Sequence, residues 1–312
     1  MAADNRPHAT AQDQVAKGIA ALVLATLLFA TQDAITKHLT ASVPVLQLMF
    51  VRYCFFALFA MLYATRGKNL RVAFRSHRPG LQLLRGLLIA GEMALFAYCL
   101  KFLGIAEMHT LFACFPLMIT GLSVPLLGEQ VGWRRWIAVS VGFAGTLVII
   151  QPGSGVFSVY AIIALACALM FAFYNIITRK VSREDSFETS LLYFGFVGLA
   201  ATGLAVPFVW QTPGLEDCLW LLAISIISIF SHLLLIKSLQ LAPAVILQPF
   251  NYFILMWAMV IGYLFYGEVL EPANLAGASL VVASGIYIAR REYQVARAER
   301  RRLRKAMYPP DA

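Results

Sequence analysis

Charged residues are scarce in this chain. Asp, Glu, Lys and Arg make up 13% of its 312 residues, whereas hydrophobic residues make up 60%, and the mean hydropathy is +0.75. A water-soluble domain needs about a quarter of its residues charged to cover its surface. The composition therefore excludes a soluble globular protein. It predicts a chain that lies in lipid, where each spanning segment must satisfy its own backbone as a helix.

Cysteines are too few and too scattered to form a disulfide framework. Five are present, all single, and no CxxC pair occurs. An odd number of isolated cysteines, mostly inside apolar runs, predicts packing residues rather than disulfides or zinc ligands, so we expect no metal site. They are Cys54, Cys99, Cys114, Cys167 and Cys218.

Motifs for ATP binding and for hydrolytic chemistry are also missing. No GxxxxGKS or GxxxxGKT phosphate loop occurs, so any use of ATP would need a separate subunit. Neither HExxH nor GxSxG is present, and the histidines are scattered. We therefore expect no catalytic residues and no cofactor, and an intramembrane enzyme acting on a lipid or isoprenoid is only a remote alternative. The histidines are His8, His38, His77, His109 and His232.

Long apolar runs fill most of the chain. A transmembrane helix needs about 20 such residues, and the connections between the runs are short, which predicts one packed bundle rather than separate domains. The fold class expected is an all-α integral membrane protein with ten transmembrane helices. We predict spans at residues 17–37, 43–65, 80–100, 105–127, 134–151, 156–178, 188–210, 217–237, 243–266 and 273–290.

Lysine and arginine predict the orientation of these spans. All but four of the 25 lie in the N-terminal segment, in loops that follow even-numbered spans, or in the C-terminal tail. Lys37 and Lys101 lie on the opposite side, and Arg52 and Arg85 lie inside spans. Because cytoplasmic loops carry the excess of positive charge, both termini are predicted to be cytoplasmic. The net charge of +9 therefore reflects membrane topology and not nucleic-acid binding.

The two halves of the chain repeat one another. In an ungapped alignment of the first and sixth spans, Asp33 meets Asn175 and Lys37 meets Arg179. Each copy has five spans, an odd number, so the second copy must be inverted in the membrane. Inverted repeats of this kind are found in many secondary transporters, with a site near the bilayer midplane.

Four segments follow from this duplication. The predicted organisation is a cytoplasmic N-terminal segment 1–16, a first five-helix repeat 17–151, a second five-helix repeat 156–290, and a basic cytoplasmic tail 291–312. The tail is expected to anchor at anionic membrane lipids.

Two features of the sequence resemble a known family. One is a short Gly-Glu step before the last span of each copy, and the other is a pattern of residues in the second half of the chain. The first step is Gly128–Glu129, and the second-half pattern is Pro249–Tyr252, Phe265–Glu268 and Gly277–Tyr287. The chain resembles the EamA-type carriers of the drug/metabolite transporter superfamily over about residues 18–290. This resemblance implies a carrier, and the superfamily carries amino acids, vitamins, nucleotide-like metabolites and drugs in either direction.

The proline in the fourth span of one copy does not match the proline in the fourth span of the other. Pro116 lies 13 residues before Glu129, whereas Pro249 lies 19 residues before Glu268. These prolines are not equivalent, so the sequence does not predict a symmetric pair of kinked helices.

Polar side chains at matching positions of the two copies are candidates for substrate binding. Gln32 and Asp33 precede the end of the first span, and Tyr174 and Asn175 stand at the matching place in the sixth. An amide and a carboxyl group where packing residues are expected suggest a polar cavity. The alternative for Asp33 is a local helix pair with Lys37, four residues further on.

The ninth span carries a third candidate group. Gln248, Asn251 and Tyr252 surround Pro249. Proline frees a backbone carbonyl, and irregular backbone inside a membrane is tolerated only where it lines protein or a cavity. Amide and phenol groups beside such a kink suit an uncharged or zwitterionic organic substrate, and this is the preferred site. Hydrogen bonding between helices is the alternative role.

Ionisable side chains inside spans are candidates for coupling, because each costs several kcal/mol in hydrocarbon unless it is paired or hydrated. Arg52 and Glu92 lie near the middle of the second and third spans and are predicted to neutralise one another, as a structural pair or one that opens for a charged substrate or proton. Arg85 is expected to extend to the cytoplasmic surface.

Two histidines and one further acid complete the coupling candidates. Glu107 and His109 lie at the start of the fourth span. The alternative role for Glu107 is a solvent-exposed acid whose negative charge stabilises the helix N-terminus. His109 can share a proton with a carboxylate. His232 lies in the eighth span, with packing as the alternative role.

Together these features predict a secondary transporter, multi-pass in a bacterial inner membrane, that works by alternating access. Its substrate is expected to be a small polar organic metabolite of amino-acid-like character. The alternative is an uptake carrier for a vitamin or nucleoside-like metabolite, such as riboflavin or S-adenosylmethionine. Protons are the candidate coupling ion, and the protein is expected to be a monomer or homodimer.

The inverted repeat makes a testable prediction about sidedness. A thiol reagent that cannot cross membranes should label Lys37→Cys from outside intact cells and should label Arg179→Cys only after the membrane is opened. The unsubstituted protein controls for the five native cysteines. Labelling of both positions from the same side would exclude inverted copies.

Overall fold

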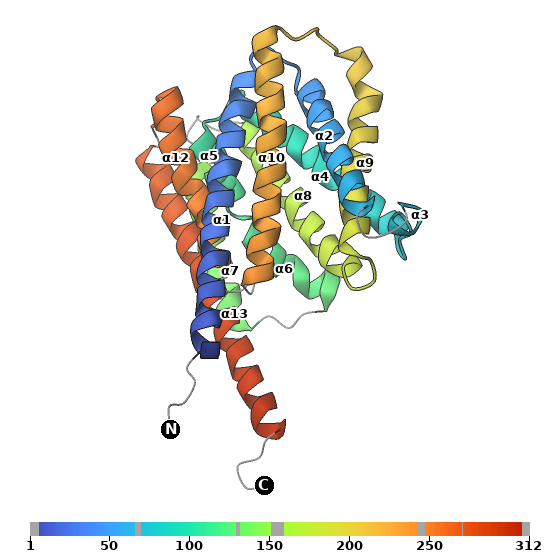
Figure 1. Ribbon diagram of the computed structural model, residues 1–312. Helices are drawn as coiled ribbons and strands as arrows, with labels where there is room; N and C mark the ends of the chain where they lie inside the picture. The colour runs from blue at the N-terminus through green and yellow to red at the C-terminus, as the bar shows by residue number, and fades with distance from the viewer. Residues whose placement is uncertain are drawn as a thin grey trace.

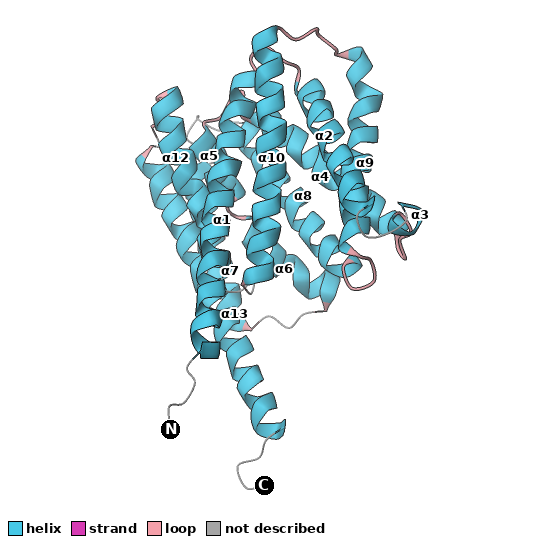
Figure 2. Ribbon diagram, viewed as in Figure 1, coloured by secondary structure: helices cyan, strands magenta, loops and turns pink. Residues whose placement is uncertain are grey.

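The computed structural model describes residues 6–65, 70–128, 132–150, 159–242, 247–269 and 271–307, and this part of the chain contains helices and no strand (Figure 2). The first half holds α1 (Arg6–Leu39), α2 (Val45–Thr65), α3 (Leu70–Ala73), α4 (Pro79–Cys99), α5 (Ile105–Phe112), α6 (Phe115–Leu127) and α7 (Trp133–Ile150). The second half holds α8 (Val159–Val181), α9 (Phe187–Ala205), η1 (Val206–Phe208), α10 (Leu215–Leu241), η2 (Gln248–Tyr252), α12 (Phe253–Tyr266) and α13 (Pro272–Met307).

Seven helical stretches in the described residues are long and apolar enough to cross a membrane. The chain is therefore a multi-pass integral membrane protein, as its composition predicted. Seven of the predicted spans overlap these stretches, two fall on the shorter apolar helices Trp136–Val148 and Phe250–Tyr266, and the last lies within α13. The seven are Gln14–Leu39, Val45–Thr65, Pro79–Cys99, Ile105–Leu126, Val159–Val181, Phe187–Phe208 and Leu215–Ser238.

Helices from the two halves alternate in the bundle (Figure 1). α1 packs along α10, α2 along α9, α7 along α13, and α4 against both α8 and α9. The start of α1 and the end of α13 lie at the same end of the bundle, where α13 extends past the other helices (Figure 1). The interior is thus built mainly from contacts between the first and second halves.

The residue pattern of α2 shows which face of the helix packs inside the bundle. Met49, Tyr53, Phe56 and Ala60 recur every three or four residues and are buried, whereas Leu62 on the opposite side is 55% exposed. Because lipid is as apolar as leucine, burial of apolar area does not decide which face packs. Close packing of small and well-fitting side chains decides it.

Small residues bring two helix pairs close together. A Cβ on Gly195 of α9 would lie 3.0 Å from the Cα of Ala57 on α2. A Cβ on Gly145 of α7 would lie 2.8 Å from the carbonyl oxygen of Gly277 on α13. Such close approach is typical of helix pairs in membranes, where van der Waals packing replaces the hydrophobic effect.

The fourth segment is irregular in both halves. α5 ends at Phe112 and α6 begins at Phe115, while η2 passes into α12 at Phe253. α6 and α12 have 13 and 14 residues and end at Gly128 and Gly267, whose φ angles of 68° and 64° favour glycine. The halves therefore share a broken fourth segment, although their prolines are not equivalent and the sequence did not predict a symmetric pair.

Arg85 lies inside the bundle instead of reaching the surface. Its side chain is only 3% exposed, Nη2 donates to the Ser190 carbonyl at 2.5 Å, and Nη1 donates to Thr178 Oγ1 at 3.4 Å. The guanidinium also lies 5.5 Å from the centre of the Tyr174 ring. The expected extension to the cytoplasmic surface was wrong, because these partners on α8 and α9 hold both Nη atoms within the bundle, while Nε has no hydrogen-bond partner among the described residues.

Asp185, in the loop between α8 and α9, holds the loop before α4. Its fully buried carboxylate accepts hydrogen bonds from Ser76 Oγ at 2.5 Å, from the His77 backbone N–H at 2.8 Å and from Gln82 Nε2 at 2.8 Å. Burial alone would raise the pKa of Asp185, but these hydrogen bonds outweigh it and the net direction is down. The ionised carboxylate therefore stabilises this end of the bundle.

Asp185→Asn should lower the stability of the detergent-solubilised protein by about 2 kcal/mol, the typical effect of hydrogen bonds to a buried charge. Because the folded-state pKa is lowered, the stabilisation is present above the unfolded value of about 4 and is lost as the pH falls through the folded value. Thermal unfolding over a pH series measures this. The exposed Glu216→Gln is the control, and an Asp185→Asn variant as stable as wild type at neutral pH would contradict the assignment.

Candidate functional site

Asp33 and His109 meet in the interior. His109 Nε2 lies 2.9 Å from Asp33 Oδ2, and the two side chains are 4% and 13% exposed. The contact joins α1 to α5, and the Phe96 ring, 5.4 Å from the imidazole, holds His109 in place. The structure thus brings together two residues that the sequence proposed for different roles. A carboxylate and an imidazole at this distance can share a proton.

Lys37 makes a separate contact at the end of α1. Its Nζ lies 2.5 Å from Glu268 Oε1 and donates to the Leu103 carbonyl at 2.9 Å, while Glu268 Oε2 accepts from the Ile105 backbone N–H at 2.7 Å. This group, which we call the α1–α12 clasp, ties α1 to the start of α5 and the end of α12. The alternative of a local Asp33–Lys37 pair was wrong, because the long lysine side chain reaches across to Glu268.

Glu107 belongs to the neighbourhood of this clasp. Its electrostatic neighbours are Glu271, Glu268 and Lys37. Although Glu107 and His109 are two residues apart, they point to different surroundings on the short helix α5, since neighbours at this spacing lie on different faces.

Arg52 and Glu92 are both buried, with 3% and 5% exposure. Within the described residues they form no ion pair closer than 4.0 Å, and Nε and Nη2 of Arg52 have no hydrogen-bond partner. The predicted direct pair is therefore absent from this conformation, because α2 packs mainly along α9 while α4 packs against α8 and α9. The charges of Asp33 and Glu92 nevertheless act on Arg52. We call Asp33, Arg52, Glu92 and His109 the polar centre.

Gln32 and His232 lie beside one another on facing helices. Ser228 Oγ of α10 donates to Gln32 Oε1 at 2.5 Å. His232 Nδ1 lies 2.7 Å from the Ser228 carbonyl oxygen, which can only accept, so Nδ1 carries the proton. The imidazole packs edge-on against Phe29 and Phe56, each 5.1 Å away. These contacts favour the packing role for His232.

Tyr174 and Asn175 of α8, which match Gln32 and Asp33 in the repeat, make fewer contacts with the polar centre. Asn175 Nδ2 donates to the Phe171 carbonyl of its own helix at 2.7 Å. Tyr174 faces Arg85 and is an electrostatic neighbour of Tyr53, which follows Arg52. The repeat therefore places Tyr174 near the interior but uses the Asn175 amide locally.

The candidates of the ninth span lie in η2, which contacts α1 and α13. The side chains of Gln248 and Pro249 lie outside the described residues, and Asn251 is half-buried. The Tyr252 ring occupies the space where a Cβ on Gly285 would lie, so it points toward α13. Its hydroxyl is buried and lacks a hydrogen-bond partner among the described atoms. Tyr252 is therefore oriented toward α13.

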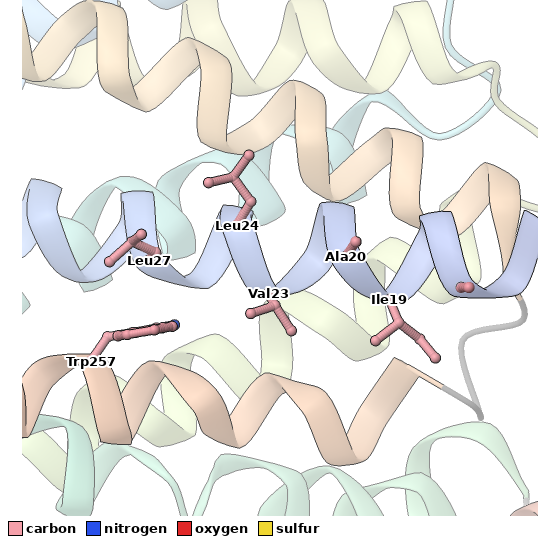
Figure 3. A pocket seen from close by; sticks show the side chains of 7 residues that line it. Ile19, Ala20, Val23, Leu24, Leu27 and Trp257 are labelled. Atoms are coloured by element: carbon pink, nitrogen blue, oxygen red, sulfur yellow. The ribbon is translucent and has the colours of Figure 1, made fainter.

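An apolar groove runs between α1 and α12 (Figure 3). Its labelled lining residues are Ile19, Ala20, Val23, Leu24, Leu27 and Trp257. None of the predicted site residues lines it, and its chemistry suits an acyl chain more than a polar solute.

Sequence reasoning missed two partners, Glu268 and Ser228. Glu268 was noticed as part of a repeated Gly-Glu step and not as a charge that faces Lys37. The scarcity of charge at that membrane side was the available signal, since an isolated lysine there needs an acid nearby. Nothing in the sequence marks Ser228 among the other serines of α10.

A helical membrane bundle with ionisable groups gathered in its interior is the architecture of a membrane transporter. Comparison with known proteins agrees. The model of the EamA-like transporter family matches residues 16–151 and 158–290. The chain belongs to this family, which confirms the resemblance seen in the sequence.

Three of the similar proteins illustrate the range of metabolites that these relatives carry. The S-adenosylmethionine uptake transporter of Rickettsia bellii is 24% identical over 272 residues, covering 87% of this chain and 92% of the relative. The riboflavin transporter of Vibrio cholerae is 26% identical, covering 89% and 95%. The pseudopaline exporter of Pseudomonas aeruginosa is 26% identical, covering 89% and 98%. Family and relatives are transporters of small metabolites and not enzymes.

One solved structure has the same fold. It matches with a TM-score of 0.61 and 19% identity, covering 87% of this chain and 96% of the other. At this identity the likeness concerns the fold.

A double-mutant cycle on the α1–α12 clasp tests the geometry. Lys37→Met and Glu268→Gln should each lower stability by about 1–3 kcal/mol, because each leaves a partly buried charged or polar partner unsatisfied. The double variant should lose less than the sum, by about 1 kcal/mol or more. Thermal unfolding in detergent measures this, with the exposed Lys101→Met as control. Strictly additive losses would show that the two side chains do not interact.

Proposed function

We propose that this protein is a secondary transporter that moves a small polar organic metabolite across a bacterial inner membrane by alternating access. The polar centre is the observation that carries the proposal. Arg52, Glu92 and His109 are buried and Asp33 is partly buried, and the four come from four helices of a lipid-embedded bundle. Ionisable groups in such surroundings are expensive and mark substrate or ion pathways.

The proposed topology has ten spans in two inverted repeats, 17–151 and 156–290, with both termini cytoplasmic. The neighbours of each helix support it. The contact of α1 with α10 has its counterpart in α8 with α4, and α12 with α1 has its counterpart in α6 with α8. Equivalent helices also pair directly, α2 with α9 and α7 with α13. Exchanging the halves therefore reproduces the packing, as a two-fold axis between them requires.

Polar contacts at both ends of the bundle suit alternating access. In the proposed orientation the α1–α12 clasp lies at the periplasmic end. At the cytoplasmic end, Arg78 Nη2 lies 2.6 Å from Glu184 Oε1, beside the hydrogen bonds of Asp185. Opening either end requires breaking one set of contacts while the other holds, which is how a carrier avoids becoming a channel.

Protons are the proposed coupling ion, with the Asp33–His109 contact as the group that takes one up. His109 is favoured over His232, because a carboxylate faces His109 and can neutralise the charge of a protonated imidazole, whereas His232 packs against Phe29 and Phe56. Glu107 is assigned to the periplasmic entrance through its neighbours in the clasp.

An amino-acid-like metabolite is the first candidate substrate. A vitamin or nucleoside-like metabolite is the second, because relatives are named as carriers of S-adenosylmethionine and riboflavin. The names include uptake transporters and an exporter, so the family supports either direction.

Vesicles containing the purified protein should equilibrate a labelled solute, unchanged and with saturable kinetics. Amino acids, S-adenosylmethionine and riboflavin are the solutes to test. Asn251→Ala should abolish the flux without affecting membrane insertion, because the amide is placed beside irregular backbone in η2. The exposed Gln14→Ala is the matched control. Normal flux in Asn251→Ala would remove this residue from the site, and a chemically altered solute would contradict the transporter itself.

A further inference from the structure

One edge of the Arg52 guanidinium is open. The unpaired atoms are Nε and Nη2, which together form the side of the group that presents two parallel N–H donors. Arg52 lies on the buried face of α2 with Met49, Tyr53 and Phe56, and is 3% exposed. Buried polar groups are almost always hydrogen-bonded, and an arginine keeps its charge in proteins. An unused pair of donors in this position needs an acceptor from elsewhere.

The acceptors around Arg52 are committed or too distant. Asp33, whose Oδ2 lies 2.9 Å from His109, is the strongest electrostatic neighbour of Arg52 but lies outside ion-pair distance, and Gln32 Oε1 already accepts from Ser228. Glu92 acts on Arg52 electrostatically but lies outside ion-pair distance. The protein therefore leaves a positive edge and a separate buried carboxyl group in one interior region.

Arg85 shows what a structural arginine looks like in the same bundle. It is equally buried, and its Nε also lacks a hydrogen-bond partner among the described residues, yet both of its Nη atoms reach Ser190 and Thr178 and its face covers Tyr174. Arg52 has no comparable set of contacts in the part of the chain that is described. Structural anchoring therefore explains Arg85 and leaves Arg52 unexplained.

We infer that the Nε–Nη2 edge of Arg52 binds a carboxylate of the transported solute, and that Glu92 faces a cationic group of the same solute. Two parallel donors match the two oxygens of a carboxylate. A zwitterion satisfies the arginine and the acid together and adds no net charge to the membrane interior. The substrate class is thus a zwitterionic carboxylic acid. This inference rests on the proposed transport function and narrows it.

Cells with and without the protein provide a test that does not require the substrate in advance. Mass spectrometry of cells and medium identifies the metabolites whose distribution depends on the wild-type chain. These should carry both a free carboxylate and a cationic group. Arg52→Met should reduce their redistribution by about tenfold or more, as expected for losing a bidentate charged contact. Arg52→Lys should retain part of it, and methyl esters of these metabolites should not compete.

A stability measurement separates binding from folding. Since the Arg52 edge has no partner among the described residues of the protein, Arg52→Met should unfold at the same or a higher temperature than wild type. Arg85→Met, which loses three contacts, should unfold at a lower temperature. A lower unfolding temperature for Arg52→Met would identify a structural arginine and overturn the inference.

The transport outcomes are also distinct. Redistributed metabolites that lack a carboxylate, or equal redistribution by Arg52→Met, would overturn the inference while leaving the transporter intact. Absence of any redistributed metabolite would overturn the proposed function, and the inference with it.

Discussion

A charge inside a lipid-embedded bundle must find its partner within the protein, and this constraint orders most of the structure. Water is absent from the hydrocarbon, so each ionisable group there raises the free energy unless another group satisfies it. Lys37 meets Glu268 and the Leu103 carbonyl, Glu268 also accepts from the Ile105 N–H, Arg85 meets α8 and α9, and Asp33 meets His109. Each contact joins helices that are distant in the chain. Arg52 and Glu92 are the exceptions, since neither forms an ion pair in the part of the chain that the structure describes, and the proposed substrate site follows from these two residues.

The frame of the bundle is symmetric, whereas its polar content is not. Small residues on α2 and α9, and on α7 and α13, let equivalent helices approach closely. The four groups of the polar centre, in contrast, all lie in the first half, on α1, α2, α4 and α5. At the spacing that relates Asp33 to Asn175, Arg52 corresponds to Phe194, an aromatic residue that packs on Phe56. For the proposed transporter, a two-fold frame would support the exchange between two open states, and a one-sided set of charges would give the solute a single orientation.

Contacts at the ends of the helices connect this interior to the two membrane faces. α5 carries both His109 of the polar centre and Ile105, whose N–H holds Glu268. Less than two turns of one short helix therefore separate the Asp33–His109 contact from the α1–α12 clasp. The helix is interrupted between α5 and α6, and the fourth segment of the second half is likewise interrupted between η2 and α12.

The sequence by itself determined that the chain lies in lipid, where its helices fall, that its halves resemble one another and which family it belongs to. These conclusions need no coordinates, because hydropathy, charge placement and repeated steps such as Asp33–Lys37 and Asn175–Arg179 are local properties of the chain. It also selected most members of the polar centre, since an ionisable residue in an apolar run is visible without coordinates. Tertiary structure alone decided which residues meet. Lys37 pairs with Glu268, 231 residues away, and Gln32 with Ser228, 196 residues away, while Arg52 and Glu92 stay apart and Arg85 turns inward. The physical reason is that the direction of a side chain around its helix has meaning only once the helices have packed, and that packing depends on every helix at once.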